Sequence, residues 1–434
     1  MRQKLISEGA NELSYEIRGI VKKAEVLKRF DQKVIWENIG DPVQKHNQVP
    51  QWMREIIIDL LQENDTYGYC HSKGVAETRA YLAMMNNKLG GAQINADDIL
   101  FFNGLGDAIS KLYQYIIPTS RVIGPSPAYS THSSAEAAHA NHHPITYRLN
   151  PENNWYPDLE ELYLKIKYNP NIVSILIINP DNPTGMVYPL EVLQKIVDIA
   201  REFDLFIVSD EIYTNITYNG TVAHPLSTII GDVPGIAMKG ISKELPWPGS
   251  RCGWVEYYNR EKDPEFNRLC QTLDNAKMIE VCSTKLPQLA IPKIFDHPQY
   301  IAYRNEMNEK IGKRSNIITE ILKPIKGLTF NQTFGAFYNT MIFKPEVLHQ
   351  NQKLHIKNKA LKTLVENEWI EQDMPNDKRF VYYLLAATGI CTVPISSFAS
   401  DLQGFRVTLL EEDEELLYKT FTTLRDAIQE YLTS

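Results

Sequence analysis

The chain has few cysteines and no long apolar segment. Its 434 residues include only five cysteines, and none of them forms a Cys-x-x-Cys pair. Neither a disulfide framework nor a zinc site is therefore indicated. No run approaches the roughly 18 consecutive apolar residues that a membrane span needs. The opening stretch MRQKLISEGANELSYEIRG also has no apolar core of the kind found in signal peptides. These absences predict a cytoplasmic protein in a reducing compartment, without a membrane partner.

The chain has fewer basic than acidic residues, and it lacks several common motifs for binding nucleic acid, dinucleotides and metals. The net charge is −8, which disfavours nucleic acid as a partner. The roughly 45 residues before the first core segments contain no basic helix-turn-helix, which disfavours a DNA-binding regulator. No G-x-G-x-x-G lies in a strand-helix-strand unit, as a Rossmann dehydrogenase would require. The histidine cluster HANHH (139–143) has poor ligand spacing and no acidic partner, so a helix end is expected there and no metal site.

The middle of the chain alternates between strand and helix patterns. The runs IVSILII (172–178) and LFIV (205–208) are short, apolar and rich in β-branched residues, which is typical of strands buried on both faces. Between them, residues 189–204 carry apolar side chains at helical spacing after a proline. The stretch DDILFF-NGLG-DAISKLYQYII (97–117) repeats the strand-turn-helix order. The pattern predicts an α/β domain with a mostly parallel central sheet flanked by helices.

The C-terminal third has a different pattern. GAFYNTMIF (335–343) and GFRVTLL (404–410) alternate like strands, and residues 413–432 form an amphipathic pattern typical of a helix. We therefore expect a smaller α+β domain. The predicted boundaries are 46–305 for the large domain, with 1–45 and 306–434 together forming the small one.

Four short motifs follow one another along the chain, and some of them lie at strand ends, where an α/β sheet binds ligands. NGLGDA (103–108) follows a strand and opens a helix, where backbone N–H groups favour phosphate. NPDNPTG (179–185) and SDEIYTNITY (209–218) each follow a buried strand. GISKELPWPGSRCGW (240–254) places a lysine ahead of a stiff loop with an arginine. Taken singly, these stretches also fit a glycine turn, an Asn-Pro turn, a helix N-cap at Ser209 or Asp210, and a surface lysine.

Together, the motifs resemble those of the class I, fold-type-I aminotransferases, which depend on pyridoxal 5′-phosphate. The order Asn182, Asp210, Tyr213, Lys243 and Arg251 is similar to that family, and the resemblance extends from YEIRG (15–19) to GFRVTLL (404–410). It implies a large cofactor-binding domain, a smaller α+β domain and a homodimer with shared active sites.

The resemblance also implies roles at the cofactor ring. Lys243 would form the Schiff base, and its released amine would carry the proton between the substrate Cα and C4′ of the cofactor. Asp210 would pair with the pyridine nitrogen, so that the ring withdraws electrons. Tyr213 and Asn182 would hydrogen-bond the ring hydroxyl, and the Asn182–Pro183 bond is a candidate cis peptide. His132 would support Asp210 or serve as a structural histidine.

Further roles concern the phosphate and the stacking face of the ring. Arg251 would bind the phosphate as a bidentate fork, next to the glycine turn formed by Gly104, Leu105 and Gly106. Tyr129 would stack on the ring. Tyr69 would reach the phosphate of the partner subunit. Many family members have a serine three residues before the lysine, but this chain has Gly240 there, which leaves that phosphate donor unassigned.

For the substrate, Arg406 would bind the α-carboxylate together with Asn182, and Gly40 would allow a close approach to the backbone. The segments YEIRG, NIGDP (38–42), YGYCHSKG (67–74), WYPDLEEL (155–162) and GISK (240–243) are similar to the alanine aminotransferase branch. This implies L-alanine and 2-oxoglutarate as substrates, in ping-pong half-reactions.

The distal carboxylate of glutamate would need a donor. Dicarboxylate-specific relatives place an arginine in the segment after the lysine, but here that region holds Lys277 and Glu280. Either Lys277 or Tyr15 serves, or the substrate is not a dicarboxylate because Glu280 repels one. Two alternatives stay open: an aminotransferase for an aspartate, aromatic or aliphatic substrate, and a C–S lyase on the same fold, because both reactions begin with loss of the Cα proton.

Overall fold

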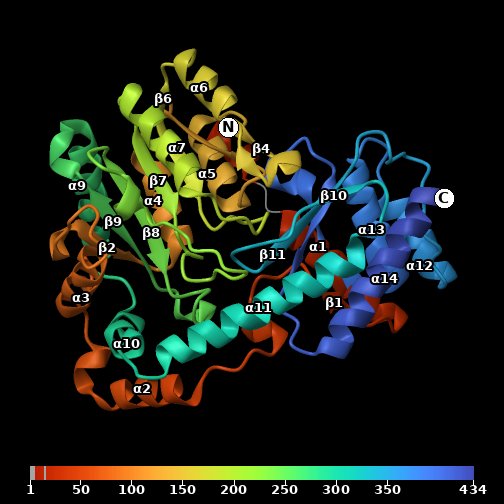
Figure 1. The fold of residues 1–434 in the computed structure, drawn as a ribbon, viewed down its shortest axis with the longest axis horizontal. Helices are drawn as coiled ribbons and strands as arrows, with labels where there is room; N and C mark the ends of the chain where they lie inside the picture. The colour runs from red at the N-terminus through yellow and green to blue at the C-terminus, as the bar shows by residue number, and fades with distance from the viewer. Residues whose placement is uncertain (1–4, 14–15) are drawn as a thin grey trace.

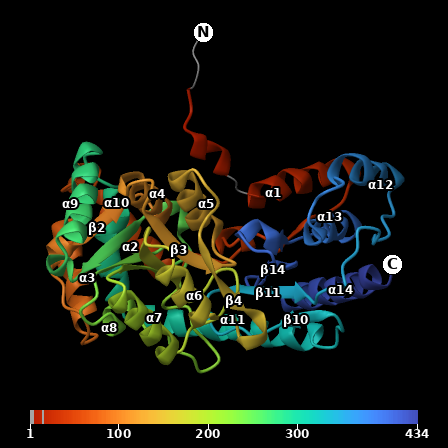
Figure 2. The ribbon, with the colours of Figure 1, turned by 90° about the horizontal axis from the view of Figure 1, so that it is seen from above.

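The computed structural model describes residues 5–13 and 16–434, and these form two lobes (Figure 1). The larger lobe surrounds an eight-stranded sheet, and the smaller lobe surrounds a four-stranded antiparallel sheet. Seen from above, the small lobe lies beside the large one, and the chain crosses between them several times (Figure 2). The predicted α/β fold with a smaller α+β domain is therefore confirmed.

The large sheet is mixed, with a parallel centre. Its strands, in spatial order, are β2 (Ile99–Phe102), β9 (Gly253–Tyr258), β8 (Gly235–Gly240), β7 (Phe206–Asp210), β6 (Ile172–Ile178), β3 (Arg121–Ser126), β4 (Thr146–Asn150) and β5 (Tyr156–Pro157). The pairs joining β8, β7, β6, β3 and β4 are parallel, whereas β9 runs antiparallel to both of its neighbours. The carboxyl ends of β6, β7 and β8 consequently meet at one edge of the sheet.

Both faces of this sheet are covered by helices. Successive residues of β6 show why: Ile175 and Ile177 pack into one apolar cluster, and Leu176 and Ile178 pack into another on the opposite face. One face is covered by α2 (Gln51–Gln62), α3 (Ala76–Asn87), α6 (Leu159–Lys167), α7 (Leu190–Glu202), α8 (Leu226–Ile229) and α10 (Lys285–Phe295). The other is covered by α4 (Leu105–Tyr115), α5 (Ser130–Ala140) and α9 (Pro264–Ile279).

The small lobe has its own apolar core. Its sheet has the order β10 (Leu328–Phe330), β11 (Tyr338–Phe343), β14 (Gly404–Thr408) and β13 (Val393–Pro394). A short parallel pair joins β1 (Ile35–Trp36) to β12 (Ile390–Cys391). The helices of this lobe are α1 (Glu16–Val26), α12 (Lys359–Leu364), α13 (Asn376–Thr388) and α14 (Glu414–Thr433). The N-terminal strand thus pairs with the C-terminal part of the chain.

One long helix connects the lobes. Helix α11 (Tyr300–Leu322) begins next to α10 and runs without a break into the small lobe (Figure 1). The predicted boundary between residues 305 and 306 falls inside it. At the other end of the chain, the short helix η1 (Glu8–Glu12) packs against α5 of the large lobe, where Gly9 N donates to Asn141 Oδ1 over 2.6 Å. The domain limits proposed from the sequence therefore stay a prediction.

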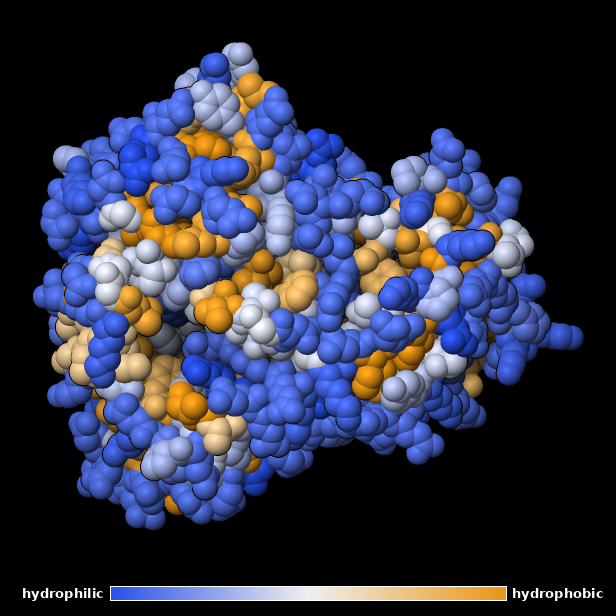
Figure 3. Space-filling model, viewed as in Figure 1, coloured by the Kyte–Doolittle hydropathy of each residue, from blue (hydrophilic) through white to orange (hydrophobic). Residues whose placement is uncertain are grey.

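Short helical turns make up most of the remaining regular structure. They are η2 (Leu27–Phe30), η3 (Val43–Lys45), η4 (Asn64–Tyr67), η5 (Ala96–Asp98), η6 (Pro151–Asn153), η7 (Pro248–Ser250), η8 (Arg260–Lys262), η10 (Ile395–Phe398) and the π-helical turn η9 (Val365–Trp369). The face seen in Figure 3 is mostly hydrophilic, with hydrophobic residues in small scattered groups. Within residues 5–13 and 16–434, no helix has the length and apolar character required to cross a membrane.

Candidate active site

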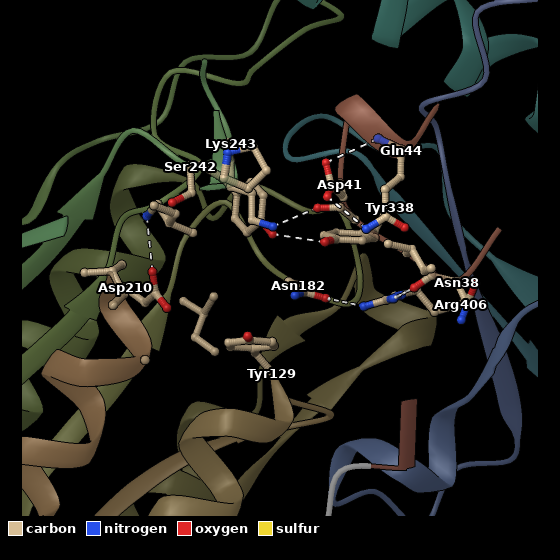
Figure 4. A pocket seen from close by; sticks show the side chains of 18 of the residues that line it. Asn38, Asp41, Gln44, Tyr129, Asn182, Asp210, Ser242, Lys243, Tyr338 and Arg406 are labelled. Carbon is tan, nitrogen blue, oxygen red and sulfur yellow. Dashed lines mark hydrogen bonds between the residues drawn. The ribbon is translucent and has the colours of Figure 1, made fainter. Parts of the chain in front are cut away.

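A cavity of about 430 Å³ lies where the carboxyl ends of β6, β7 and β8 face the small lobe. The large lobe contributes Leu105, Gly106, Tyr129, Ile178, Asn182, Asp210, Ile212, Tyr213, Ser242, Lys243, Pro248 and Arg251, and the rest of the chain contributes Val21, Asn38, Ile39, Gly40, Asp41, Gln44, Tyr338 and Arg406. Figure 4 shows Asp210 at one end and Arg406 with Tyr338 at the other, while Lys243 and Tyr129 lie on opposite sides. The structure thus brings together most of the side chains that the sequence singled out.

The end of the cavity beside α4 is built to bind an anion. Within the described residues, the N–H groups of Leu105 and Gly106 donate to no protein acceptor, as expected in the first turn of a helix. Arg251 lies next to this turn, with Nη2 3.4 Å from the carbonyl oxygen of Asn103. Gly104 has φ +84°, and a Cβ there would lie 2.4 Å from Arg251 Nη2. A side chain at position 104 would therefore displace the guanidinium from this turn.

Asp210 lies at the opposite edge of the large-lobe part of the cavity, at the end of β7. Its side chain is buried, and Oδ2 lies 2.9 Å from Nε2 of His132 on α5. Its other oxygen, Oδ1, accepts from Ile212 N over 3.1 Å. A buried carboxylate needs such partners. The contact with His132 that the sequence suggested is present, and Asp210 ends a strand instead of capping a helix.

Lys243 reaches across the cavity toward the N-terminal part of the chain. Its Nζ donates to the carbonyl oxygen of Gly40 over 2.7 Å. Close by, the hydroxyl groups of Tyr213 and Tyr338 lie 3.1 Å apart. Burial, and then the neighbouring Tyr338, raise the pKa of Tyr213 well above its ordinary value. Tyr213 therefore keeps its proton at neutral pH and can donate a hydrogen bond.

Arg406 comes from β14 of the small lobe and is almost completely buried. Its Nη1 donates to Asn182 Oδ1 over 3.0 Å, and its Nη2 donates to the carbonyl oxygen of Asn38 over 2.5 Å. Nε has no partner within the described residues. Asn182, in turn, lies in the loop after β6, so this contact joins the two lobes. A guanidinium fixed in this way can bind a carboxylate that enters the cavity.

One prediction about the backbone is wrong. The Asn182–Pro183 bond is not cis; among the residues that the structure describes, the cis bonds are Asn179–Pro180 and Ser126–Pro127. The motif NPDNPTG contains two Asn-Pro bonds, and the sequence alone does not distinguish them. Around the cis bond, Asn179 N donates to the carbonyl oxygen of Asp210, and Asn179 Oδ1 accepts from Tyr188 N.

Some side chains that the sequence suggested for the site do not line the cavity within the described residues. Tyr69 is 82% exposed and has no contact with the cavity of its own subunit. Tyr15 lies outside the described residues.

The sequence also suggested Lys277 and Glu280 as neighbours of the substrate, but they lie behind α4. Lys277 Nζ is 3.2 Å from Asp107 Oδ2 and is also paired with Glu280. Although burial acts in the opposite direction, hydrogen bonds from Lys111 and Lys277 lower the pKa of Glu280. Within its own subunit, Glu280 therefore does not line the cavity and is paired with Lys111 and Lys277.

Several cavity residues were missed by the sequence reasoning: Asn38, Asp41, Gln44, Ser242 and Tyr338. Ser242 directly precedes Lys243. Its hydroxyl could have been considered from the sequence as a replacement for the serine that is missing at position 240. Gly240 itself ends β8, and a Cβ there would lie 3.0 Å from the carbonyl oxygen of Cys252. Asn38 and Asp41 belong to the motif NIGDP, of which only Gly40 was assigned a role.

The fold and this arrangement of lysine, acid, phenol and anion site define a fold-type-I aminotransferase, and comparisons with known proteins agree. Residues 32–418 match the family described as aminotransferase class I and II, so the chain belongs to this family. It is 52% identical over 432 residues to an uncharacterised aminotransferase of Methanocaldococcus jannaschii, with all of both chains covered. It is 28% identical to the glutamate-pyruvate aminotransferase AlaA of Escherichia coli strain K12, over 90% of this chain and 96% of the relative. The solved structure of an alanine aminotransferase from Pyrococcus furiosus has a TM-score of 0.83 and 26% identity, covering 99% of this chain and 100% of that one.

The enzyme is therefore a pyridoxal-phosphate-dependent aminotransferase, and the cavity fits that cofactor. The free N–H groups of Leu105 and Gly106 and the guanidinium of Arg251 match the charge of a phosphate. The buried carboxylate of Asp210 matches a protonated ring nitrogen, and Lys243 is the only lysine among the lining residues of this cavity. When bound, the cofactor supplies the electron-withdrawing ring that stabilises negative charge at the substrate Cα.

Proposed function

We propose that the enzyme transfers the amino group between L-alanine and 2-oxoglutarate in ping-pong half-reactions. The observation that carries this proposal is the pairing of Arg406 with Asn182 at the end of the cavity opposite Asp210. A carboxylate held there presents its Cα toward Lys243. The relatives named glutamate-pyruvate and alanine aminotransferase support this choice of substrates.

Each residue has a defined task in this proposal. Lys243 would hold the cofactor through Nζ, and its amine is the base that would move a proton between the substrate Cα and C4′ of the cofactor. Asp210, oriented by His132, keeps the ring nitrogen protonated. Tyr213 and Asn182 donate to the ring oxygen. Tyr129 packs on the ring face.

The phosphate and substrate ends complete the assignment. Arg251 and the N–H groups at the start of α4 bind the phosphate, with Ser242 in place of the hydroxyl that Gly240 lacks. Arg406 binds the α-carboxylate. The apolar side chains of Val21 and Ile39 line the cavity and suit a methyl side chain such as that of alanine. For the distal carboxylate of glutamate, Tyr15 stays a prediction from the sequence.

We infer that the enzyme acts as a homodimer with shared sites. An exposed apolar patch lies beside the anion site and consists of Tyr67 and Tyr69, exposed by 71% and 82%, with Met278, Ile279 and Val281, exposed by 56%, 85% and 49%. Lys285 holds its two segments together, with Nζ 2.8 Å from Asp65 Oδ2. A second copy of the chain would bury this patch and bring Tyr69 to the partner's phosphate. The five free cysteines suit the reducing cytoplasm, where we place the enzyme.

The test is a set of separate half-reactions, followed by absorbance. The purified holoenzyme is mixed with single amino acids in the absence of a 2-oxo acid. Alanine and glutamate are expected to change the cofactor spectrum and to release stoichiometric pyruvate and 2-oxoglutarate, and the opposite oxo acid should restore the spectrum. Continuous release of pyruvate and ammonia without an acceptor would instead indicate a lyase. A spectrum that responds to other amino acids but not to alanine or glutamate would contradict the substrate assignment.

A further inference from the structure

Tyr338 connects two groups to which the proposed function gives separate tasks. It begins β11, is 3% exposed and lines the cavity. In the register of β11 and β14, Tyr338 lies opposite Thr408 and Thr340 lies opposite Arg406. Tyr338 and Arg406 are therefore diagonal neighbours on one face of the sheet. The carbon at the centre of the Arg406 guanidinium lies 4.3 Å from the ring centroid of Tyr338, so the ring supports the guanidinium by a cation–π contact.

The hydroxyl group of the same tyrosine points to Tyr213. The two phenol oxygens are 3.1 Å apart, and the rings meet edge to face with centroids 5.8 Å apart. Gly40 closes the other side, because a Cβ at position 40 would lie 1.9 Å from the Tyr338 oxygen. The hydroxyl is thus confined between the backbone of Gly40 and the phenol of Tyr213, which limits its freedom to turn away.

Proton counting fixes the direction of this hydrogen bond when an acceptor is present in the cavity. Each phenol has one proton. One of the two protons forms the hydrogen bond between the phenol oxygens, and the other can be donated to a different acceptor. If Tyr213 donates to the ring oxygen of the cofactor, Tyr338 must donate to Tyr213. A donor whose oxygen also accepts a hydrogen bond becomes a stronger donor, because the bonds polarise each other.

We propose that Tyr338 is a positioning residue that couples the carboxylate clamp to the phenol network: its ring orients Arg406, and its hydroxyl donates to Tyr213 and strengthens the bond from Tyr213 to the cofactor. This inference rests on the proposed function. It predicts that the two halves of the Tyr338 side chain, the ring and the hydroxyl group, act separately.

The hydroxyl is tested by a spectrophotometric pH titration of the holoenzyme. Removing it with Tyr338→Phe is expected to raise the midpoint of the cofactor absorbance change by about half a pH unit, because Tyr213 then stabilises the negative ring oxygen less well. Tyr213→Phe should raise the midpoint further, and adding Tyr338→Phe to it should change nothing more. The matched control is Tyr218→Phe, which removes a buried hydroxyl bound to Thr333 and to the carbonyl oxygen of Gly335, outside the cavity.

The ring is tested with propionate, a carboxylate that has no amino group to transfer. Tyr338→Phe keeps the ring and should leave the Kd of propionate within about twofold, whereas Tyr338→Leu should weaken it by about threefold to thirtyfold. An unchanged midpoint in Tyr338→Phe, or an equal shift in the Tyr213→Phe background, would overturn the inference while leaving the proposed function intact. A wild-type spectrum that is unaffected by Lys243→Ala would overturn both.

Discussion

Arg406 Nη1 lies 3.0 Å from Asn182 Oδ1, and this contact spans the two lobes. The arginine belongs to β14, and the asparagine belongs to the loop that follows β6. The substrate clamp therefore exists only when the lobes are in their observed positions. A lysine cannot reproduce this arrangement, because its single ammonium group lacks the planar fork that binds Asn182, the Asn38 carbonyl and a carboxylate together.

We accordingly expect Arg406→Lys to raise the KM for alanine by about tenfold to a hundredfold. The loss should be seen in the affinity measured in the alanine half-reaction, with the cofactor spectrum in the absence of substrate unchanged. Arg425→Lys, on the outer helix α14, is the matched control and should behave like the wild type. Equal affinity for alanine in Arg406→Lys would show that this arginine is not the clamp.

Ser242 is expected to supply the phosphate hydroxyl that Gly240 lacks. Ser242→Ala should raise the Kd of pyridoxal phosphate for the apoenzyme by about tenfold to a hundredfold, because a hydrogen bond to the charged phosphate is lost. Titration of the apoenzyme, followed by absorbance, gives this constant. Ser250→Ala is the informative comparison, because that hydroxyl is buried and has no partner within the described residues. If only Ser250→Ala weakens binding, Ser250 is the donor.

Tyr69 is expected to act on the cofactor of the partner subunit. Tyr69→Phe should weaken pyridoxal phosphate binding by about tenfold to a hundredfold, because a hydrogen bond to a charged phosphate is lost. Light scattering should still show a dimer. Tyr67→Phe is a close control, since Tyr67 is similarly exposed but its hydroxyl donates to the carbonyl oxygen of Leu61 over 2.7 Å within the same chain. Wild-type affinity in Tyr69→Phe, or an equal loss in Tyr67→Phe, would contradict this role.

Glu244 makes stability depend on pH. This residue follows Lys243, is buried, and is bound by Tyr300 at the start of α11 and by Asn215 Nδ2 over 2.9 Å. Burial raises its pKa from 4.5 to about 7, although Asn215 and Arg304 oppose the shift. Between these two values the folded protein holds a proton that the unfolded chain has released. Unfolding then releases a proton, so the free energy of unfolding falls as pH rises through this range.

The contribution of Glu244 amounts to about 3 kcal/mol between pH 4.5 and 7. Urea denaturation at pH 5 and at pH 7.5 should show a smaller decrease in stability for Glu244→Gln than for the wild type. Glu306→Gln, which changes an exposed residue on α11, should retain the wild-type decrease. A Glu244→Gln profile parallel to that of the wild type would disprove this assignment.

The sequence by itself determined the local parts of this protein. Ile172–Ile178 forms a buried strand because an unbroken β-branched run suits both faces of a parallel sheet, and the glycine turn at 103–106 precedes a helix as its pattern indicates. Asp210 could be placed at a strand end for the same reason, since strand, turn and helix signals act over a few residues. Family resemblance then supplied their expected chemistry.

Only the tertiary structure decided which distant residues meet. The cavity joins Gly40 to Lys243 and Arg406 to Asn182 because α11 and the paired β1 and β12 bring the chain ends back over the carboxyl edge of the large sheet. The contact of Tyr338 with both Arg406 and Tyr213 depends on the register of β11 and β14 and on the seam between the lobes. Likewise, Lys277 pairs with Asp107 behind α4. Such contacts arise from the packing of whole elements, which no short stretch of sequence encodes.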